Sequence, residues 1–147
     1  MINCQISLKS GFTLLEMLVV LVIIALLAGL VGPRLFSQAD AAKVKTTQVQ
    51  VKMFKGALET LRLDIGRFPT EEEGLTLLRT PPSDTQIQPL WKGPYLDEAV
   101  PVDPWNRPYQ YGIPGRDGQP FALYSFGGDG QPGGVDYNAD IGYLPLH

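Results

Sequence analysis

The stretch LLEMLVVLVIIALLAGLV, residues 14–31, decides the fold of this chain. It is almost wholly apolar and about as long as the roughly 20 residues that a helix needs to span a bilayer. It exceeds the apolar core of an ordinary secretory signal, which has roughly 7–15 residues, and no small-residue cleavage site follows it. The pattern therefore predicts a membrane-spanning helix near the N-terminus, and a plain one-pass anchor is the simplest interpretation.

Glu16 argues against a plain anchor. An acidic residue inside an apolar helix costs on the order of 2.5–3.5 kcal/mol on insertion scales, and no basic residue lies within one helical turn. A cut between Gly11 and Phe12 would create a new amine four residues before Glu16, on the same chain or on a neighbouring copy. In a low dielectric such a pair would set the register between subunits. A position of Glu16 near the lipid headgroups remains the alternative.

Residues 9–16, KSGFTLLE, closely resemble the processing site of type IV pilins and pseudopilins. The resemblance implies that a leader, residues 1–11, is removed after Gly11 by a prepilin peptidase, which also methylates the new N-terminal Phe12. It implies that Glu16 guides assembly. It also places the N-terminus in the cytoplasm and the rest of the chain in the periplasm, a choice that the scattered basic residues do not settle. The leader departs from the family in having Lys9 as its only basic residue.

One long helix is expected from about Phe12 to Ile65. A defect is expected near Gly32-Pro33, because a proline removes a helical hydrogen bond. We divide the helix into a membrane-spanning, filament-core half (12–34) and an amphipathic half (35–66). The second half is predicted from one apolar stripe at helical spacing, made of Val44, Val51, Phe54, Leu58, Leu61 and Ile65. Gly66 and Pro69 are typical of a helix end.

Residues 67–147 are predicted to form a periplasmic globular region. Thr70 and Glu73 have the spacing of a capping box at the start of a short helix, which we favour over a cation site among the glutamates there. Alternating side chains in 109–113 and 121–125, separated by a glycine-containing loop, predict a β-hairpin. The fold class is therefore α+β, a long helix packed on a small antiparallel sheet.

Residues 125–141 are rich in glycine and have too little apolar surface to fold through their own packing. Asp129, Asp136, Asn138 and Asp140 supply hard oxygen atoms, and a calcium ion takes about 6–8 of these, including backbone carbonyls. The spacing is not that of an EF-hand. Composition alone leaves an ion site and a solvated Asp-Gly turn region equally open.

A second resemblance covers nearly the whole chain after the leader. It is to the major pseudopilin family, protein G of the general secretion pathway, and rests on the segments FPT (68–70), EGL (73–75), GPYL (93–96), DPWN (103–106), PYQY (108–111), SFGGDG (125–130) and NADI (138–141). The resemblance implies one calcium ion in the C-terminal loop. Asp129, Asp140 and the carbonyl of Phe126 are the expected ligands, with Asp136 and Asn138 as secondary candidates. Phe126, Gly128 and residues 135–137 depart from common family residues.

Other classes have little support. The net charge is −3 and there is no basic patch with interleaved aromatic residues, so nucleic-acid binding is not expected. The chain has one histidine, His147, at its last position, and one cysteine, Cys4, in the leader. It has no hydrolase, zinc-protease or phosphate-loop motif. We therefore expect no enzymatic activity.

The expected function is that of a major pseudopilin in a type II secretion system. It would be held in the inner membrane by a single span and would polymerise into a periplasmic pseudopilus that drives folded exoproteins through a secretin. Its expected partners are copies of itself, minor pseudopilins, an inner-membrane assembly platform and the prepilin peptidase. The alternatives are a type IV pilus subunit for adhesion or motility, disfavoured because the mature chain lacks a cysteine pair, and a monomeric one-pass periplasmic binding module.

Overall fold

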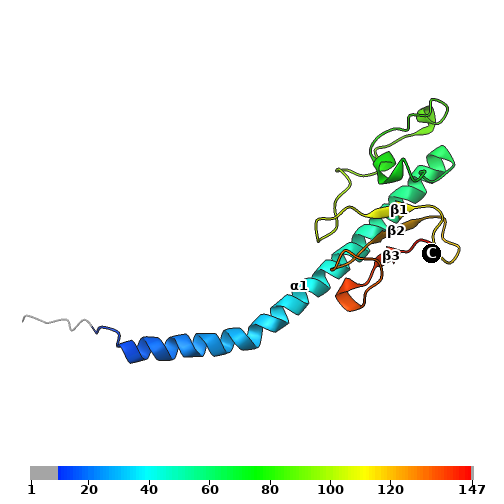
Figure 1. Cartoon of the computed structure of the whole chain (residues 1–147). Helices are drawn as coiled ribbons and strands as arrows, with labels where there is room; N and C mark the ends of the chain where they lie inside the picture. The colour runs from blue at the N-terminus through cyan, green and yellow to red at the C-terminus, as the bar shows by residue number, and fades with distance from the viewer. Residues whose placement is uncertain (1–9, 147) are drawn as a thin grey trace, which may run out of the picture. The chain divides into compact units, whose positions relative to one another are not determined.

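The structure is a computed structural model that describes residues 10–146. It contains helix α1 (Leu14–Ile65), three short 3₁₀ helices, η1 (Gly74–Leu78), η2 (Gln88–Leu90) and η3 (Asp136–Asn138), and strands β1 (Gln110–Gly112), β2 (Ala122–Ser125) and β3 (Ile141–Tyr143). The chain divides into two compact units, one up to Gln38 and one from Ala39 onward. Figure 1 shows the elements in chain order.

Helix α1 continues through Pro33, so the expected defect does not end the helix. Proline fixes φ near the helical value, and its missing N–H costs one hydrogen bond. In the first unit, the side chains of the apolar run are exposed, and the most apolar window of α1 has a mean hydropathy of 3.0 with none of its surface buried. Such a helix is long and apolar enough to cross a membrane by length and composition.

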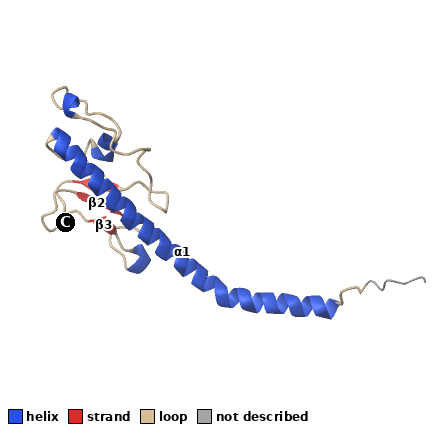
Figure 2. Ribbon diagram, turned by 180° about the vertical axis from the view of Figure 1, so that it is seen from behind, coloured by secondary structure: helices blue, strands red, loops and turns tan. Residues whose placement is uncertain are grey.

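In the second unit, the predicted apolar stripe of α1 forms the core. Val51, Phe54, Leu58, Leu61 and Ile65 are buried, and Val44 at the upper end is partly buried. The five buried residues pack against a cluster from the rest of the unit that includes Leu75, Leu78, Leu96, Tyr109, Phe121 and Leu123. Amphipathic spacing thus places one face of the helix on the globular region, as Figure 2 shows from behind.

The sheet is antiparallel, with the strand order β1-β2-β3. The predicted hairpin is confirmed, because Tyr111 of β1 lies opposite Leu123 of β2. The third strand was not predicted. It pairs with β2 through Ser125 opposite Ile141 and so brings the end of the glycine-rich segment back to the sheet. The α+β fold of a long helix on a small antiparallel sheet is therefore confirmed.

The predicted capping box is also present. The N–H of Glu73 donates to Thr70 Oγ1 at 3.2 Å, and the N–H of Thr70 donates to Glu73 Oε2 at 2.9 Å. The turn that follows leads into η1, whose Leu75, Leu77 and Leu78 are buried. The favoured interpretation of this segment, capping, is the one that the structure bears out.

Candidate functional site

The predicted processing point lies in an exposed segment. Gly11 and Phe12 belong to the irregular residues 10–13 that precede α1, and Phe12 is 76% exposed. Apart from Gly11 itself and its two chain neighbours, no atom of residues 10–146 lies within 4 Å of the place where a side chain on Gly11 would be. The peptide bond between Gly11 and Phe12 is therefore open to a peptidase. Lys9 and the rest of the predicted leader lie outside the described residues.

Helix α1 starts with a cap that the sequence analysis missed. Thr13 Oγ1 accepts the N–H of Glu16 at 3.1 Å, and the Thr13 carbonyl accepts the N–H of Met17 at 3.2 Å. The spacing Thr-x-x-Glu at residues 13–16 is the same capping signature that was found at 70–73, so the signal was present in the sequence. Thr13 thereby fixes the backbone of Glu16 in the first turn of the helix.

Glu16 is an exposed carboxylate on an otherwise apolar surface. No ion pair to it is found among residues 10–146. Around and beyond it, large apolar side chains are exposed along the helix as far as Leu35 and Phe36. This surface is suited to lipid or to copies of itself, and it leaves the acid without a partner inside the described chain.

The glycine-rich segment forms a folded loop between β2 and β3. Asp129 Oδ1 accepts the N–H of Gln131 at 3.0 Å, and Asp140 Oδ2 accepts the N–H of Gly133 at 2.9 Å. The Asp140 N–H returns to the Gly133 carbonyl at 3.1 Å, and the Gly128 N–H donates to the Tyr137 carbonyl at 2.8 Å. The two arms of the loop are therefore tied to each other.

Oxygen atoms crowd the two glycines where the arms meet. A side chain on Gly127, which has φ +66°, would overlap the Ala139 carbonyl oxygen, and one on Gly128 would lie 2.7 Å from Asn138 Oδ1. A side chain on Gly134 would likewise overlap the Asn138 carbonyl oxygen. The absence of Cβ atoms lets several oxygens approach closely, which is what a hard cation needs.

Asp140 has an unsatisfied oxygen. Its Oδ1 is buried and has no hydrogen-bond partner, and among the described residues the only other such side-chain atom is Arg107 Nε. A buried acceptor without a partner costs about 1–3 kcal/mol, so this oxygen favours a missing donor or cation. Of the predicted ligands, Asp140 is thus the one whose surroundings fit a bound ion.

The other predicted ligands are placed differently. Asp129 and Asp136 are exposed, Asn138 lies in η3, and Phe126 is half-buried with its ring edge-on to Tyr124. Within residues 10–146, three or more acidic, histidine or cysteine side chains are not gathered as they would be in a carboxylate-rich metal centre. An ion in this loop would depend mainly on backbone carbonyls together with Asp140. The full ligand set stays a prediction.

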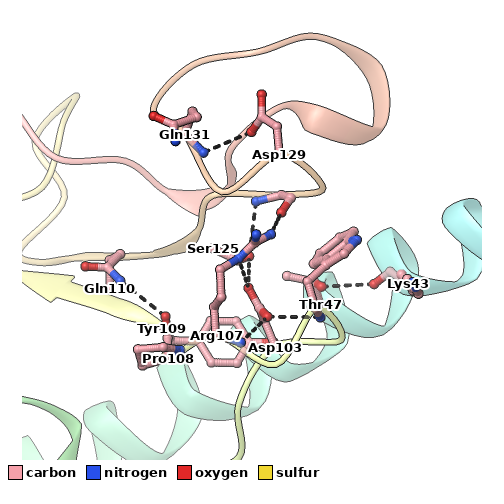
Figure 3. A network of polar contacts seen from close by, with 12 residues as sticks. Lys43, Thr47, Asp103, Arg107, Pro108, Tyr109, Gln110, Ser125, Asp129 and Gln131 are labelled. Atoms are coloured by element: carbon pink, nitrogen blue, oxygen red, sulfur yellow. Dashed lines mark hydrogen bonds and ion pairs between the residues drawn. The ribbon is translucent and has the colours of Figure 1, made fainter.

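The buried carboxylate of Asp103 connects the loop to the turn at residues 103–107. Its Oδ1 accepts the N–H of Trp105 at 3.0 Å and of Arg107 at 2.9 Å, and its Oδ2 accepts the Ser125 hydroxyl at 2.6 Å. Ser125 Oγ in turn accepts the N–H of Gly127 at 3.2 Å, so one side chain connects the turn at 103–107 to the start of the loop (Figure 3). The DPWN segment was quoted above only for its resemblance, and its structural role was not predicted.

Two family models match the chain. The first, type II secretion system protein G, covers residues 34–144, and the second, the prokaryotic N-terminal methylation motif, covers residues 6–32. The chain belongs to the type II secretion system protein G family. This membership confirms the resemblance and the predicted role of a major pseudopilin, and it does not favour the pilus alternative. The family consists of structural subunits and is not a known enzyme family.

Individual relatives agree with this family membership. The chain is 45% identical over 135 residues to the type II secretion system core protein G of Pseudomonas aeruginosa, covering 91% of this chain and 94% of that protein. It is 37% identical to the core protein G of Vibrio cholerae, covering 91% and 90%. The crystal structure of the major pseudopilin of enterohaemorrhagic Escherichia coli is 30% identical, with a TM-score of 0.60 over 74% of this chain and 92% of that one.

Proposed function

We propose that the chain, after loss of residues 1–11, polymerises through its apolar helix into a periplasmic pseudopilus. The observation that carries this proposal is the exposed apolar surface from Phe12 to Phe36, on which Glu16 has no ion-pair partner among the described residues. A lipid environment accommodates the apolar side chains, whereas the acid costs on the order of 2.5–3.5 kcal/mol there on insertion scales. A neighbouring copy supplies both an apolar face and, at its Phe12, the amine that the acid lacks.

The partners of this process follow from the proposed role. A prepilin peptidase would cut and methylate the chain, and an inner-membrane assembly platform would extract it from the bilayer. Minor pseudopilins would join the same filament, whose growth would move folded exoproteins through the secretin. The amphipathic half of α1 and the globular unit would remain in the periplasm, outside the filament core.

Protein export tests this role. In the source bacterium, deletion of the gene is expected to leave exoproteins folded in the periplasm, and the unaltered gene is expected to restore their release. Immunoblots of culture medium and periplasm measure both, with a periplasmic marker as the control for leakage. Loss of surface fibres without any export defect would instead support the pilus alternative.

Mass spectrometry of the N-terminus tests processing. In peptidase-competent cells, we expect a mature chain that begins with N-methylated Phe12. The variant Gly11→Val, which puts a branched side chain at the cleavage point, should keep its leader. The matched variant Ser10→Val alters the neighbouring position and should still be cut after Gly11. A chain that retains Met1 in both peptidase-competent and peptidase-deficient cells would contradict processing.

We further propose that the loop between β2 and β3 holds one calcium ion. The buried, unpartnered Asp140 Oδ1 and the crowded carbonyl oxygens at Gly127 and Gly134 support this. The ion would neutralise Asp140 and tie the two arms together. A chelator should lower the melting temperature of the full chain in detergent, and Asp140→Asn should remove most of this calcium dependence. Asp97→Asn, an exposed change elsewhere, should retain it.

A further inference from the structure

The backbone of Arg107 is fixed by Asp103. The Arg107 N–H donates to Asp103 Oδ1 at 2.9 Å, and the Asp103 N–H donates to the Arg107 carbonyl at 2.8 Å. Asp103 is 2% exposed. These paired bonds close a tight turn, which determines where the Arg107 side chain begins and in which direction it can extend.

The guanidinium of Arg107 reaches from this turn to the loop. One of its terminal nitrogens donates to the Gly127 carbonyl, and a side chain on Gly130 would overlap the other terminal nitrogen. Figure 3 shows Arg107 between Asp103 and the loop segment that carries Asp129. The side chain thus contacts both ends of residues 127–130, which we call the entry arm of the loop.

Two side chains therefore bind the entry arm, and the same carboxylate positions both of them. Ser125 holds the Gly127 N–H and Arg107 holds the Gly127 carbonyl, and both are oriented by Asp103. Among the described residues, the hydrogen bonds found for the opposite arm lie within the loop, between Gly133 and Asp140 and from the Gly128 N–H to the Tyr137 carbonyl. The buried Asp140 Oδ1 has no hydrogen-bond partner among residues 10–146.

We propose that Arg107 is a positioning residue for calcium, which orders the entry arm before the ion binds. This inference rests on the calcium site proposed above. Ordering a glycine-rich segment is costly, because each residue loses backbone conformational entropy when it is fixed and glycine loses the most. An ion that binds an already ordered arm avoids part of that cost and binds more tightly.

The positive charge of Arg107 lowers the affinity for calcium, whereas its ordering of the entry arm raises it. A guanidinium near a calcium ion repels it, so removal of the charge alone would strengthen binding. Asp103 limits this effect, since its Oδ2 lies 4.0 Å from Arg107 Nε and its side chain is only 1% exposed. The buried carboxylate offsets most of the positive charge that the ion meets. We therefore expect the ordering effect to dominate.

Calorimetric titration of the processed full chain in detergent micelles, with calcium chloride, tests this role. Arg107→Gln should bind calcium about tenfold more weakly than the unaltered chain, equivalent to loss of one hydrogen bond to a charged group. Arg107→Lys, which keeps the charge and one donor, should fall between them. Lys92→Gln removes a positive charge that is 75% exposed and pairs with Asp64, so it should leave the affinity unchanged.

Hydrogen exchange in a calcium chelator supplies the second measurement. Exchange at residues 127–131 should be faster in Arg107→Gln, while exchange in the centre of α1 stays as in the unaltered chain, which shows that the variant is folded. Unchanged exchange, or an affinity that is equal or tighter, would overturn the positioning role. If the unaltered chain itself gives no calcium heat, the ion site fails and the positioning role with it. Faster hydrogen exchange in Arg107→Gln would then show that Arg107 stabilises the loop without any role in calcium binding.

Discussion

Glu73 shows how one side chain serves two structural purposes. Its carboxylate accepts two hydrogen bonds from the Arg67 guanidinium, at 2.7 and 2.9 Å, and one from the N–H of Thr70. The Arg67 guanidinium, assisted by the Thr70 N–H, holds the pKa of Glu73 below its ordinary value of 4.5, although burial acts to raise it. The capping box is therefore coupled to an ion pair with the residue that follows the helix-ending Gly66.

This coupling predicts an acid-dependent stability. Because the folded pKa of Glu73 lies below the unfolded one, its stabilisation is complete above about pH 4.5 and is lost as the pH falls through the folded pKa. Glu73→Gln should melt lower than the unaltered chain at pH 7, and its melting temperature should fall less between pH 7 and pH 3.5. Thermal melts followed by circular dichroism in detergent measure both differences.

Glu72→Gln is the matched control for this prediction. Glu72 is exposed and adjacent in sequence, and no hydrogen bond or ion pair of its side chain is found in the described part of the chain. Its variant should follow the acid dependence of the unaltered chain. Equal acid dependence in Glu73→Gln and Glu72→Gln would contradict the role given to Glu73.

At this scale the sequence predicts local pairs better than distant ones. The box at Thr70 and Glu73 could be predicted because both partners lie within four residues. The pairing with Arg67 could not, since it depends on the reversal at Gly66, whose φ is +84°. Asp103 was missed for a similar reason, because its partner Ser125 is 22 residues away and meets it only after β2 has formed.

Helix α1 is the element whose sequence was most informative. Its apolar stripe repeats at helical spacing, so the residues that form the core follow directly from periodicity. Strand β3 gave no such signal, since Ile141–Tyr143 is too short to show alternation and follows a glycine-rich segment. It pairs with β2 because the loop between the two strands folds back and brings residues 141–143 beside β2. Composition left the choice between an ion site and a solvated turn region in this loop open for the same reason.

The stripe predicts a large contrast between two leucines of α1. Leu58 is fully buried and Leu63 is 85% exposed, although both lie on the same helix. Leu58→Ala should lower the free energy of unfolding by about 3 kcal/mol through lost burial and a residual cavity. Leu63→Ala should change it by less than about 0.5 kcal/mol. Urea unfolding of the globular unit within the full chain, followed by tryptophan fluorescence, measures the difference.

The helix propensities of the two variants are matched, because both replace leucine by alanine inside one helix. A difference in stability therefore reports packing and not helix formation. Equal losses in the two variants would show that the predicted stripe does not form the core of the unit in solution.

At the scale of the whole molecule, the two compact units meet opposite physical demands. The unit from Ala39 onward buries its apolar residues in its own core, whereas the unit up to Gln38 leaves them exposed. Folding of the chain therefore completes only one of the two units. The exposed apolar surface of the other unit is suited to lipid or to further copies, which fits the proposed subunit that is stored in a membrane and used in a filament.

Replacement of Glu16 tests this division directly. Glu16→Gln keeps the size and the Thr13 cap, which uses only the backbone N–H of residue 16. Membrane insertion and the melting temperature of the globular unit should therefore stay unchanged. Filament yield should fall at least about tenfold, because the variant lacks the carboxylate that we propose to pair with the Phe12 amine of a neighbour in a low-dielectric environment. Sheared filaments, quantified by sedimentation and immunoblotting against total membrane-bound subunit, give the yield.

Glu98→Gln removes an equal charge from the exposed surface of the globular unit and should polymerise normally. If Glu16→Gln also polymerised normally, the acid would be needed neither for register nor for assembly, and burial of the apolar helix alone would have to hold the subunits. If its insertion failed instead, Glu16 would act before assembly, within the bilayer. The proposed order is therefore insertion with an unpaired acid first and neutralisation by a second copy afterwards, and the membrane and filament fractions of one culture separate these two steps.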